Sequence, residues 1–381
     1  MIYLDNAATT LIKPSAVHAA VRRAMETMAS PGRGAYKAAM RASELALDCR
    51  IEAAELFHVP EPEQVVFTMN ATHALNIAIS SLAGKGSRVL ISGFEHNAVT
   101  RPLHALGAKI VTAGSRLFDR EDTLRSFEER ISSVDLVVCT HVSNVFGYIL
   151  PICEIAELCR MNGVPLILDA SQSAGVLEVD MRELGAAFIA MPGHKALYGP
   201  QGTGLLLCGM PGVPLLHGGS GSDSVRQAMP DYLPDRLEAG THNIAGIAGL
   251  LEGLRFVRER GLQSIAGYEQ KLLARMAESL RSCGDLELFR GDAGMQTGVL
   301  SVRCGRMSCE SLAALLDERG ICVRAGLHCA PLAHQSAGTI DGGTVRFSFS
   351  AFTDPAHIDA ACLAIKELVG GVKEHDDKIH E

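Results

Sequence analysis

The stretch that decides the fold is AFIAMPGHKALYGPQGTG, residues 187–204. It begins with an apolar run that predicts a buried strand, which Pro192 and Gly193 end. His194 and Lys195 would then lie just beyond the strand, where open α/β sheets bind their ligands. A lysine in such a dry, glycine-lined turn loses its proton easily, so its amine could form an imine with an aldehyde cofactor. Taken alone, the pattern is more often a solvated loop lysine.

On both sides of this stretch, short apolar runs alternate with segments of helical periodicity. The apolar runs predict about seven strands, at residues 64–68, 88–92, 109–112, 136–140, 165–168, 187–191 and 203–207. Helices are expected between most of them, and two further helices, at 14–29 and 35–57, precede them. Alternating β and α units with nearly continuous apolar strands predict an α/β fold, in which helices cover both faces of a mostly parallel seven-stranded sheet.

The sequence changes character after the last of these strands. Residues 209–243 are rich in Gly, Ser and Pro and too long for a passive connection, so we expect a functional or interface loop. Helices at 244–260 and 262–283 would bridge to a smaller α+β unit, which has strands near 286–289, 298–302, 322–324 and 344–348 covered by helices at 308–319 and 355–369. We therefore expect a large domain at 13–258, and a small domain formed by 1–12 and 259–381 whose polar tail frays.

Composition limits the class of protein. A chain of 381 residues with 47% hydrophobic and 20% charged residues is expected to be soluble and globular, with more than one core. A formal net charge of −8 and the absence of Trp give no reason to expect nucleic acid. No leader or membrane-spanning run is visible, so we expect a cytoplasmic protein. The eleven cysteines form no Cys-x-x-Cys pair, which favours reduced thiols over disulfides or a metal site.

Polar residues follow several of the predicted strands, and each has an ordinary interpretation as well as a functional one. Residues 70–72 (NAT) suit a helix N-cap, but the free N–H groups there could also cradle a phosphate. His96 is an ordinary loop histidine, or a flat ring that stacks on a cofactor. Asn144 suits a turn, or donates to a phenolate oxygen. Asp169 ends an apolar strand and requires a cationic partner, such as a protonated pyridine nitrogen.

Together these motifs resemble the class V, aminotransferase-like pyridoxal-phosphate enzymes, and most closely the cysteine desulfurase and selenocysteine lyase family. The resemblance covers nearly the whole chain and implies the fold-type I architecture. It rests on residues 3–10 (YLDNAATT), His96, 141–144 (HVSN), 169–172 (DASQ), 193–195 (GHK), 238–241 (EAGT), 324–329 (RAGLHC) and 345–346 (VR).

The resemblance implies pyridoxal 5'-phosphate as the cofactor. Lys195 would bind it and then move the substrate's Cα proton, Asp169 would hold the pyridine nitrogen, and His96 would stack on the ring. Further cofactor contacts implied in the same way are Ala71, Thr72 and His194 at the phosphate, Gln172 at the phenolic oxygen, and Thr241 at the phosphate of a partner subunit. A site shared in this way implies a homodimer.

The resemblance also implies how the substrate carboxylate is held. Asn144 and Arg346 would bind it, and an arginine suits that task because it can donate two parallel hydrogen bonds. Arg33 and Arg324 are weaker candidates for the same pocket.

Cys329 separates this branch of the family from ordinary transaminases. On composition alone it is one more buried cysteine, but its place between Arg324, His328 and a polar loop is expected to favour the thiolate. In the family reaction the cysteine attacks the sulfur of L-cysteine, which gives L-alanine and a persulfide on Cys329. An acceptor protein would then take up the sulfur.

Some residues depart from the family pattern. Pro192 stands where Ser or Thr is usual, and Leu327 and Tyr36 stand where histidines are common, which leaves substrate choice and rate open.

The leading hypothesis is a pyridoxal-phosphate-dependent cysteine desulfurase. A lyase acting on L-selenocysteine is the first alternative. Others are a transaminase, epimerase or lyase in which Cys329 is incidental, and a non-catalytic protein with this fold.

Overall fold

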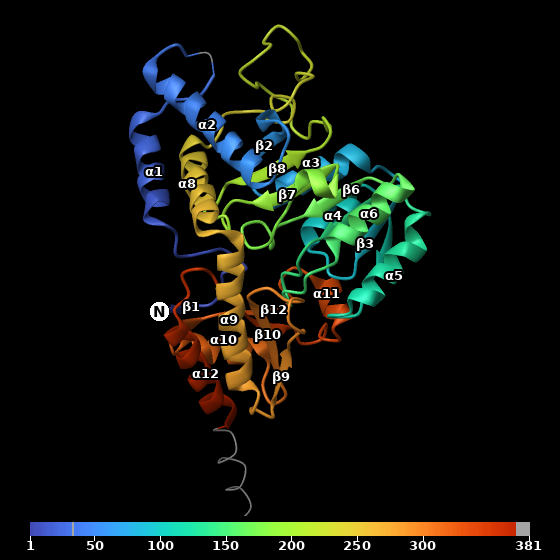
Figure 1. Cartoon of the computed structure of the whole chain (residues 1–381), viewed down its shortest axis with the longest axis vertical. Coiled ribbons are helices and arrows are strands. Elements are labelled where there is room, and N and C mark those ends of the chain that lie inside the picture. Colours follow the sequence, from blue (N-terminus) through green and yellow to red (C-terminus); the bar gives the residue numbers. More distant parts are fainter. Residues whose placement is uncertain (33, 371–381) are drawn as a thin grey trace, which may run out of the picture.

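A computed structural model describes residues 1–32 and 34–370. Its central sheet has the strand order β2-β8-β7-β6-β5-β3-β4 (Figure 1). The strands are β2 (Val65–Thr68), β3 (Arg88–Ser92), β4 (Lys109–Ala113), β5 (Leu136–Thr140), β6 (Leu166–Asp169), β7 (Phe188–Pro192) and β8 (Gly204–Cys208). Only β8 runs antiparallel to its neighbours among these strands. The predicted α/β fold with a mostly parallel seven-stranded sheet is confirmed.

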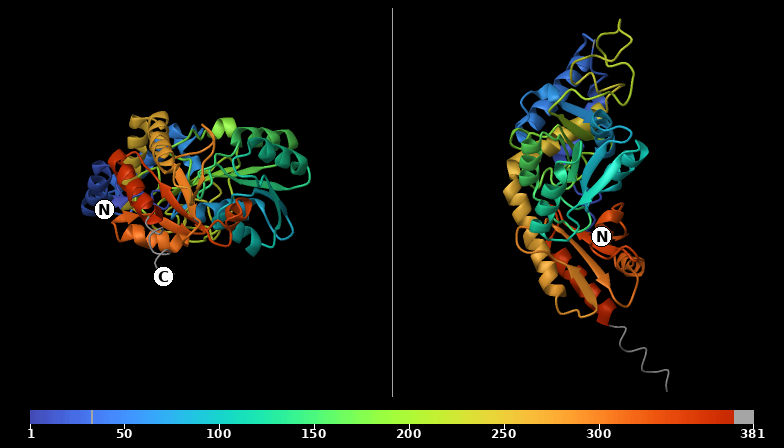
Figure 2. Two further views of the ribbon diagram at one scale, coloured as in Figure 1. Left: turned by 90° about the horizontal axis from the view of Figure 1, so that it is seen from below. Right: turned by 90° about the vertical axis from the view of Figure 1, so that its right-hand side faces the viewer.

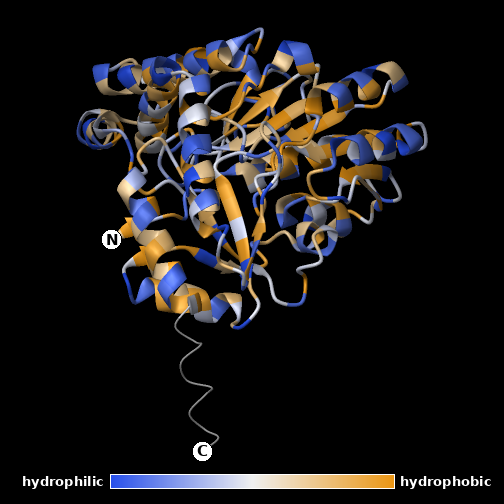
Figure 3. Cartoon of the chain, turned by 60° about the horizontal axis from the view of Figure 1, so that its bottom comes forward, coloured by the Kyte–Doolittle hydropathy of each residue, from blue (hydrophilic) through white to orange (hydrophobic). Residues whose placement is uncertain are grey.

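Helices cover both faces of this sheet because successive strand residues point to opposite sides. In β6, Leu166 and Leu168 belong to one apolar core and Ile167 to another. The first core includes residues of α2 (Lys37–Leu56), α5 (Arg120–Ile131), α6 (Ile152–Asn162) and α8 (Ile244–Arg260), and the second includes α3 (Ala71–Leu82) and α4 (Asn97–Ala105). Helix α1 (Ser15–Thr27) packs on α8. Figure 3 shows the apolar strands lying between helices whose outer surfaces are hydrophilic.

The C-terminal part of the chain forms a second sheet with its own apolar core. Its order is β12-β13-β10-β9, all antiparallel, from β9 (Leu286–Phe289), β10 (Val299–Cys304), β12 (Arg324–Gly326) and β13 (Thr344–Ser348). Helices α9 (Leu262–Leu280), α10 (Cys309–Asp317), α11 (Pro331–Ser336) and α12 (Pro355–Gly370) accompany it. Figure 2 shows α8 and α9 running one after the other along one side of both units.

The N-terminal segment joins this second unit. Strand β1 (Ile2–Tyr3) pairs in parallel with β11 (Ile321–Cys322), and Ser348 N donates to Leu4 O at 2.7 Å. This pairing agrees with assigning residues 1–12 to the small domain, although the boundaries at 13–258 and 259–381 stay a prediction. The predicted fraying tail lies outside the described residues.

Some local predictions need correction. The single strand expected at 322–324 is two strands, because β11 pairs with β1 whereas β12 pairs with β13. The short helices α7 (Met181–Leu184) and α11 were not predicted. Residues 209–243 contain no helix or strand and project from the large unit (Figure 1). Within the part of the chain that the structure describes, no helix combines the length and apolarity that crossing a bilayer requires.

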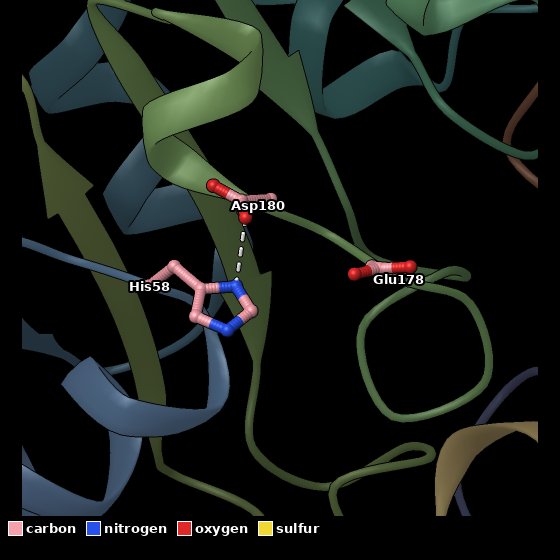
Figure 4. Close-up of side chains that lie close together, drawn as sticks. All are labelled: His58, Glu178 and Asp180. Carbon is pink, nitrogen blue, oxygen red and sulfur yellow. Dashed lines mark ion pairs between the residues drawn. The ribbon is translucent and has the colours of Figure 1, made fainter.

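A polar contact fastens α2 to α7 on the surface of the large unit. His58 Nδ1 lies 2.8 Å from Asp180 Oδ2 (Figure 4). Met181 N also donates to Phe57 O at 2.9 Å. The ligand-type atoms of His58, Asp180 and Glu178 lie within 4.8 Å of one another. The other oxygen of Asp180 accepts hydrogen bonds at the start of α7. Both oxygens of this carboxylate therefore have structural partners.

Candidate active site

A cavity of about 180 Å³ opens where the carboxyl ends of β5, β6 and β7 meet the amino ends of α3 and α4. Parallel strands bring these ends to one edge of the sheet, and the register places Asp169 opposite both Thr140 and Ala190. Most of the predicted cofactor residues line this cavity: Ala71, Thr72, His96, Asp169, Gln172, His194 and Lys195. The predicted substrate residue Asn144 lines it as well.

Lys195 follows β7 in a tight turn. Gly193 N donates to Thr203 O at 2.9 Å, and a Cβ at Gly193 would lie 2.2 Å from Thr203 Oγ1, so only glycine fits there. Burial lowers the pKa of Lys195 to about 8, although Asp169 opposes that shift by favouring the charged ammonium. The turn therefore holds an amine that loses its proton more readily than a surface lysine.

Asp169 ends β6 and His96 follows β3, on the two sides of β5, and both residues line the same cavity. Asp169 is buried, and its Oδ1 accepts a hydrogen bond from Ser171 N at 2.9 Å. His96 caps α4, where its Nδ1 accepts from Ala98 N at 3.0 Å, so a neutral ring carries its proton on Nε2. Burial lowers the pKa of His96, which favours the neutral ring. The pocket thus combines a buried carboxylate, a flat ring and an amine.

Glu95 is a structural part of this site that sequence reasoning missed. It is fully buried, and its Oε1 accepts a hydrogen bond from Thr140 N at 2.8 Å, which ties the end of β3 to the end of β5. Burial raises the pKa of Glu95 to about 8. The signal in the sequence was a carboxylate in the loop that follows an apolar strand, directly before His96.

The predicted phosphate end lies at the start of α3. Asn70 is the N-cap, because its Oδ1 accepts from His73 N at 2.9 Å, and the next two residues, Ala71 and Thr72, line the cavity. Both interpretations of this motif are therefore compatible. His194 Nδ1 lies 3.1 Å from Thr9 Oγ1, and burial lowers the pKa of His194 to about 4.

Two of the predicted contacts differ from the rest, and Pro192 departs from the family pattern. Thr241 lines a neighbouring pocket and not the cavity that contains Lys195, so one chain does not bring these two residues together. Gln172 lines the cavity, but its Nε2 donates to Ala7 O at 3.0 Å, so this nitrogen already binds the N-terminal loop. Pro192 ends β7 on the cavity wall and offers neither a hydroxyl nor an N–H.

The predicted carboxylate-binding arginines meet at Asp5, which sequence reasoning did not single out. Arg346 is buried, and its NH2 lies 2.8 Å from Asp5 Oδ1 while its NH1 donates to Asn144 O at 2.9 Å. Arg324 contacts the other Asp5 oxygen and is largely exposed. Arg33 lies outside the described residues. The only sequence signal for Asp5 was its place at the start of the motif DNAATT.

Cys329 is exposed on the loop of residues 327–330, which we call the cysteine loop. His328 and Cys329 both have left-handed backbones, with φ of 48° and 55°. Asn144 Nδ2 donates to His328 O at 2.8 Å and Asn97 N donates to Cys329 O at 2.8 Å, so the loop is fastened beside His96. Cys329 is thus not the buried cysteine that composition favours.

The two basic residues near Cys329, His328 and Arg324, contact other groups in the structure. The His328 ring is buried with its Nε2 3.2 Å from Thr344 Oγ1, and burial holds the pKa of His328 far below its usual range. The ring is therefore neutral and adds no positive charge beside Cys329, whereas the expected thiolate on Cys329 stays a prediction. Arg324 is paired with Asp5. Leu327 and Tyr36, the two other departures from the family pattern, are exposed.

Comparisons with known proteins agree with this geometry. The family model described as aminotransferase class-V matches residues 2–361. A probable cysteine desulfurase of Methanothermobacter thermautotrophicus is 33% identical over 97% of this chain and 95% of its own. A probable cysteine desulfurase of Pyrococcus abyssi is 30% identical over 98% and 95%.

Solved structures show the same likeness. The apo structure of a cysteine desulfurase from Thermococcus onnurineus NA1 has a TM-score of 0.88 and 30% identity, covering 97% of this chain and 95% of that one. The match therefore spans both sheets and the cavity between the strand ends. The chain belongs to the aminotransferase class-V family, among the cysteine desulfurases of that family.

Proposed function

We propose that this protein is a pyridoxal-phosphate-dependent cysteine desulfurase that converts L-cysteine to L-alanine and collects the sulfur on Cys329. The convergence of Lys195, Asp169 and His96 on one cavity supports the cofactor chemistry. The hydrogen bond from Asn97 N to Cys329 O supports the sulfur chemistry, because it holds the cysteine loop next to His96.

The chemistry of the cavity fits the proposed cofactor. A buried carboxylate suits the pyridine nitrogen, the His96 ring suits the ring face, and the start of α3 suits the phosphate. Pyridoxal phosphate, when bound, supplies an electron sink for the bonds of the substrate's Cα. Lys195 would hold the cofactor and then accept the Cα proton at Nζ, a role that suits an amine with a pKa of about 8.

The atoms and electrons of the sulfur step balance over L-cysteine and Cys329 alone, although the step also needs the electron sink that the cofactor would supply. The carbon–sulfur bond of L-cysteine breaks, and a sulfur–sulfur bond forms to Cys329 Sγ. One L-cysteine and one thiol give one L-alanine and one persulfide, so no external oxidant is required. Exposure of the cysteine loop supports transfer of that sulfur to an acceptor protein.

We also propose a homodimer with a shared site. A wide groove beside the 209–243 loop is lined by residues of α2 and by Thr241. A second copy seated there would let Thr241 reach the phosphate of the partner subunit, which explains why Thr241 lies outside its own cavity. A cytoplasmic location is supported by the cysteines, all of which are free.

The central test compares two exposed cysteines. Purified protein should be yellow and release L-alanine from L-cysteine. Cys329→Ala should lose at least about a hundredfold in this rate, because the nucleophile is gone, whereas Cys153→Ala, also exposed, should keep it. Full desulfuration by Cys329→Ala would remove the proposal. If wild type and Cys329→Ala both act on L-selenocysteine and neither acts on L-cysteine, the alternative of a selenocysteine lyase is favoured.

A further inference from the structure

Asp5 links two arginines beside the candidate substrate pocket. Its Oδ1 lies 2.8 Å from Arg346 NH2, and its Oδ2 lies 3.0 Å from Arg324 Nε and 2.9 Å from Arg324 NH2. The two arginine side chains differ in exposure, at 3% for Arg346 and 52% for Arg324. A single buried carboxylate therefore connects an interior guanidinium group to a surface one.

Arg346 is buried and has one edge of its guanidinium group without a complete set of partners. Its NH1 donates to Asn144 O, whereas its Nε is buried and has no hydrogen-bond partner among the described residues. NH2 carries two hydrogens, and Asp5 accepts one of them. Buried N–H donors are nearly always satisfied, and the Nε/NH2 edge can bind a carboxylate with two parallel hydrogen bonds. This edge therefore suits a carboxylate ligand.

Charge in this part of the site depends on Asp5. Two guanidinium groups and one carboxylate leave a single net positive charge. That charge matches one substrate carboxylate, whereas removal of Asp5 would leave two positive charges side by side. Lys195 and Asp169 act on the same region from the large unit, and they carry opposite charges when both are ionised.

We propose that Asp5 positions Arg346 and sets the charge of the pocket, so that the site accepts amino acids with one carboxylate and discriminates against those with a second acid group. The inference rests on the proposed role of Arg346 in binding the substrate carboxylate. Asp5 is a positioning residue, because it acts through Arg346 and not through contact with the substrate.

The test uses the full-length protein loaded with pyridoxal phosphate and two amino acids without sulfur. Isothermal titration calorimetry gives Kd for L-alanine, with one carboxylate, and for L-aspartate, with two. Asp5→Asn keeps the side-chain shape and removes the charge. It should shift the ratio of the two Kd values by about tenfold or more towards L-aspartate. Arg324→Met should shift the ratio the opposite way.

A matched control and the kinetics separate positioning from stability. Asp359→Asn breaks the exposed pair with Arg275 and should keep the ratio within about twofold, as expected for surface pairs. Asp5→Asn should also raise KM for L-cysteine more than it lowers kcat, because it disturbs binding. A purely structural role would lower Tm and leave the Kd ratio unchanged.

The outcomes distinguish this inference from the proposed function. An Asp5→Asn ratio within twofold of wild type overturns the inference, and so does a wild type that binds neither amino acid. If Asp5→Asn fails to fold, Arg324→Met decides alone, and an unchanged ratio overturns the inference. If Asp5→Asn shifts the Kd ratio as expected but wild type releases no L-alanine from L-cysteine, only the proposed function is overturned.

Discussion

The cavity at Lys195 and the cysteine loop, which we propose serve one reaction, are built differently. Lys195 and Asp169 lie at the ends of interior strands, where backbone hydrogen bonds and two apolar cores fix them. Cys329 lies on an exposed loop with two consecutive left-handed residues, fastened through backbone carbonyls by Asn144 and Asn97.

The difference follows from what each group has to do. A lysine gains reactivity from burial, because a dry site disfavours the ammonium and lowers the pKa of the amine. A thiol that hands sulfur to another protein must be accessible, so burial would defeat its purpose. The fold thus separates an interior cavity from an exposed cysteine, Cys329, whose backbone is held by hydrogen bonds.

The largest effect should come from the pocket. Lys195→Ala should reduce desulfuration by at least about a hundredfold, because it removes both the cofactor anchor and the base. Borohydride treatment followed by peptide mass spectrometry should find the cofactor on Lys195 in wild type only. The exposed Lys366→Ala is the matched control and should keep both label and rate. An unlabelled Lys195 in active wild type would contradict the assignment.

An intermediate effect should come from the support of the cysteine loop. His328→Ala removes a buried ring that contacts Thr344 and stacks on His334 at 5.7 Å. The free energy of unfolding should fall by roughly 1–3 kcal/mol, as for other lost buried hydrogen bonds. Persulfide formation should fall, whereas the cofactor absorbance should remain. Thr344→Val keeps the ring and should have a smaller effect. Loss of cofactor in His328→Ala would show that loop and pocket are not independent.

The smallest effect concerns the cost of burying charge beside the pocket. Glu269 of α9 lines a small cavity together with Lys195, and burial raises the pKa of Glu269 to about 8. A raised folded-state pKa means that the folded protein keeps this proton while the unfolded chain loses it above about pH 4.5. Stability should therefore fall as pH rises from about 5 to 8.

Glu269→Gln cannot titrate and should lack this loss. At pH 8 its free energy of unfolding in urea should exceed that of wild type by about 1 kcal/mol or more, with a smaller difference near pH 5. Glu287→Gln, at an exposed pair with Arg303, should show no such pH dependence. A pH-independent difference between Glu269→Gln and wild type would indicate a packing effect instead.

Most of the large sheet could be predicted because its strands are interior and read as apolar runs. The apolar run that ends in Asp169 predicted strand β6, its C-terminal end and the buried carboxylate proposed to bind the cofactor. The break between β11 and β12 could not be predicted, because pairing with the distant strands β1 and β13 decides it. The roles of Glu95 and Asp5 were missed for the same reason, since their partners are distant in sequence.

The sequence by itself determined the alternation of strands and helices, the lysine beyond β7 and the family resemblance, because local periodicity and short motifs carry that information. Only the tertiary structure decided which groups are neutral, paired or exposed. Burial lowers the pKa of His328, Asp5 pairs with two arginines, and Cys329 is exposed, since burial and long-range contacts exist only once the chain has folded.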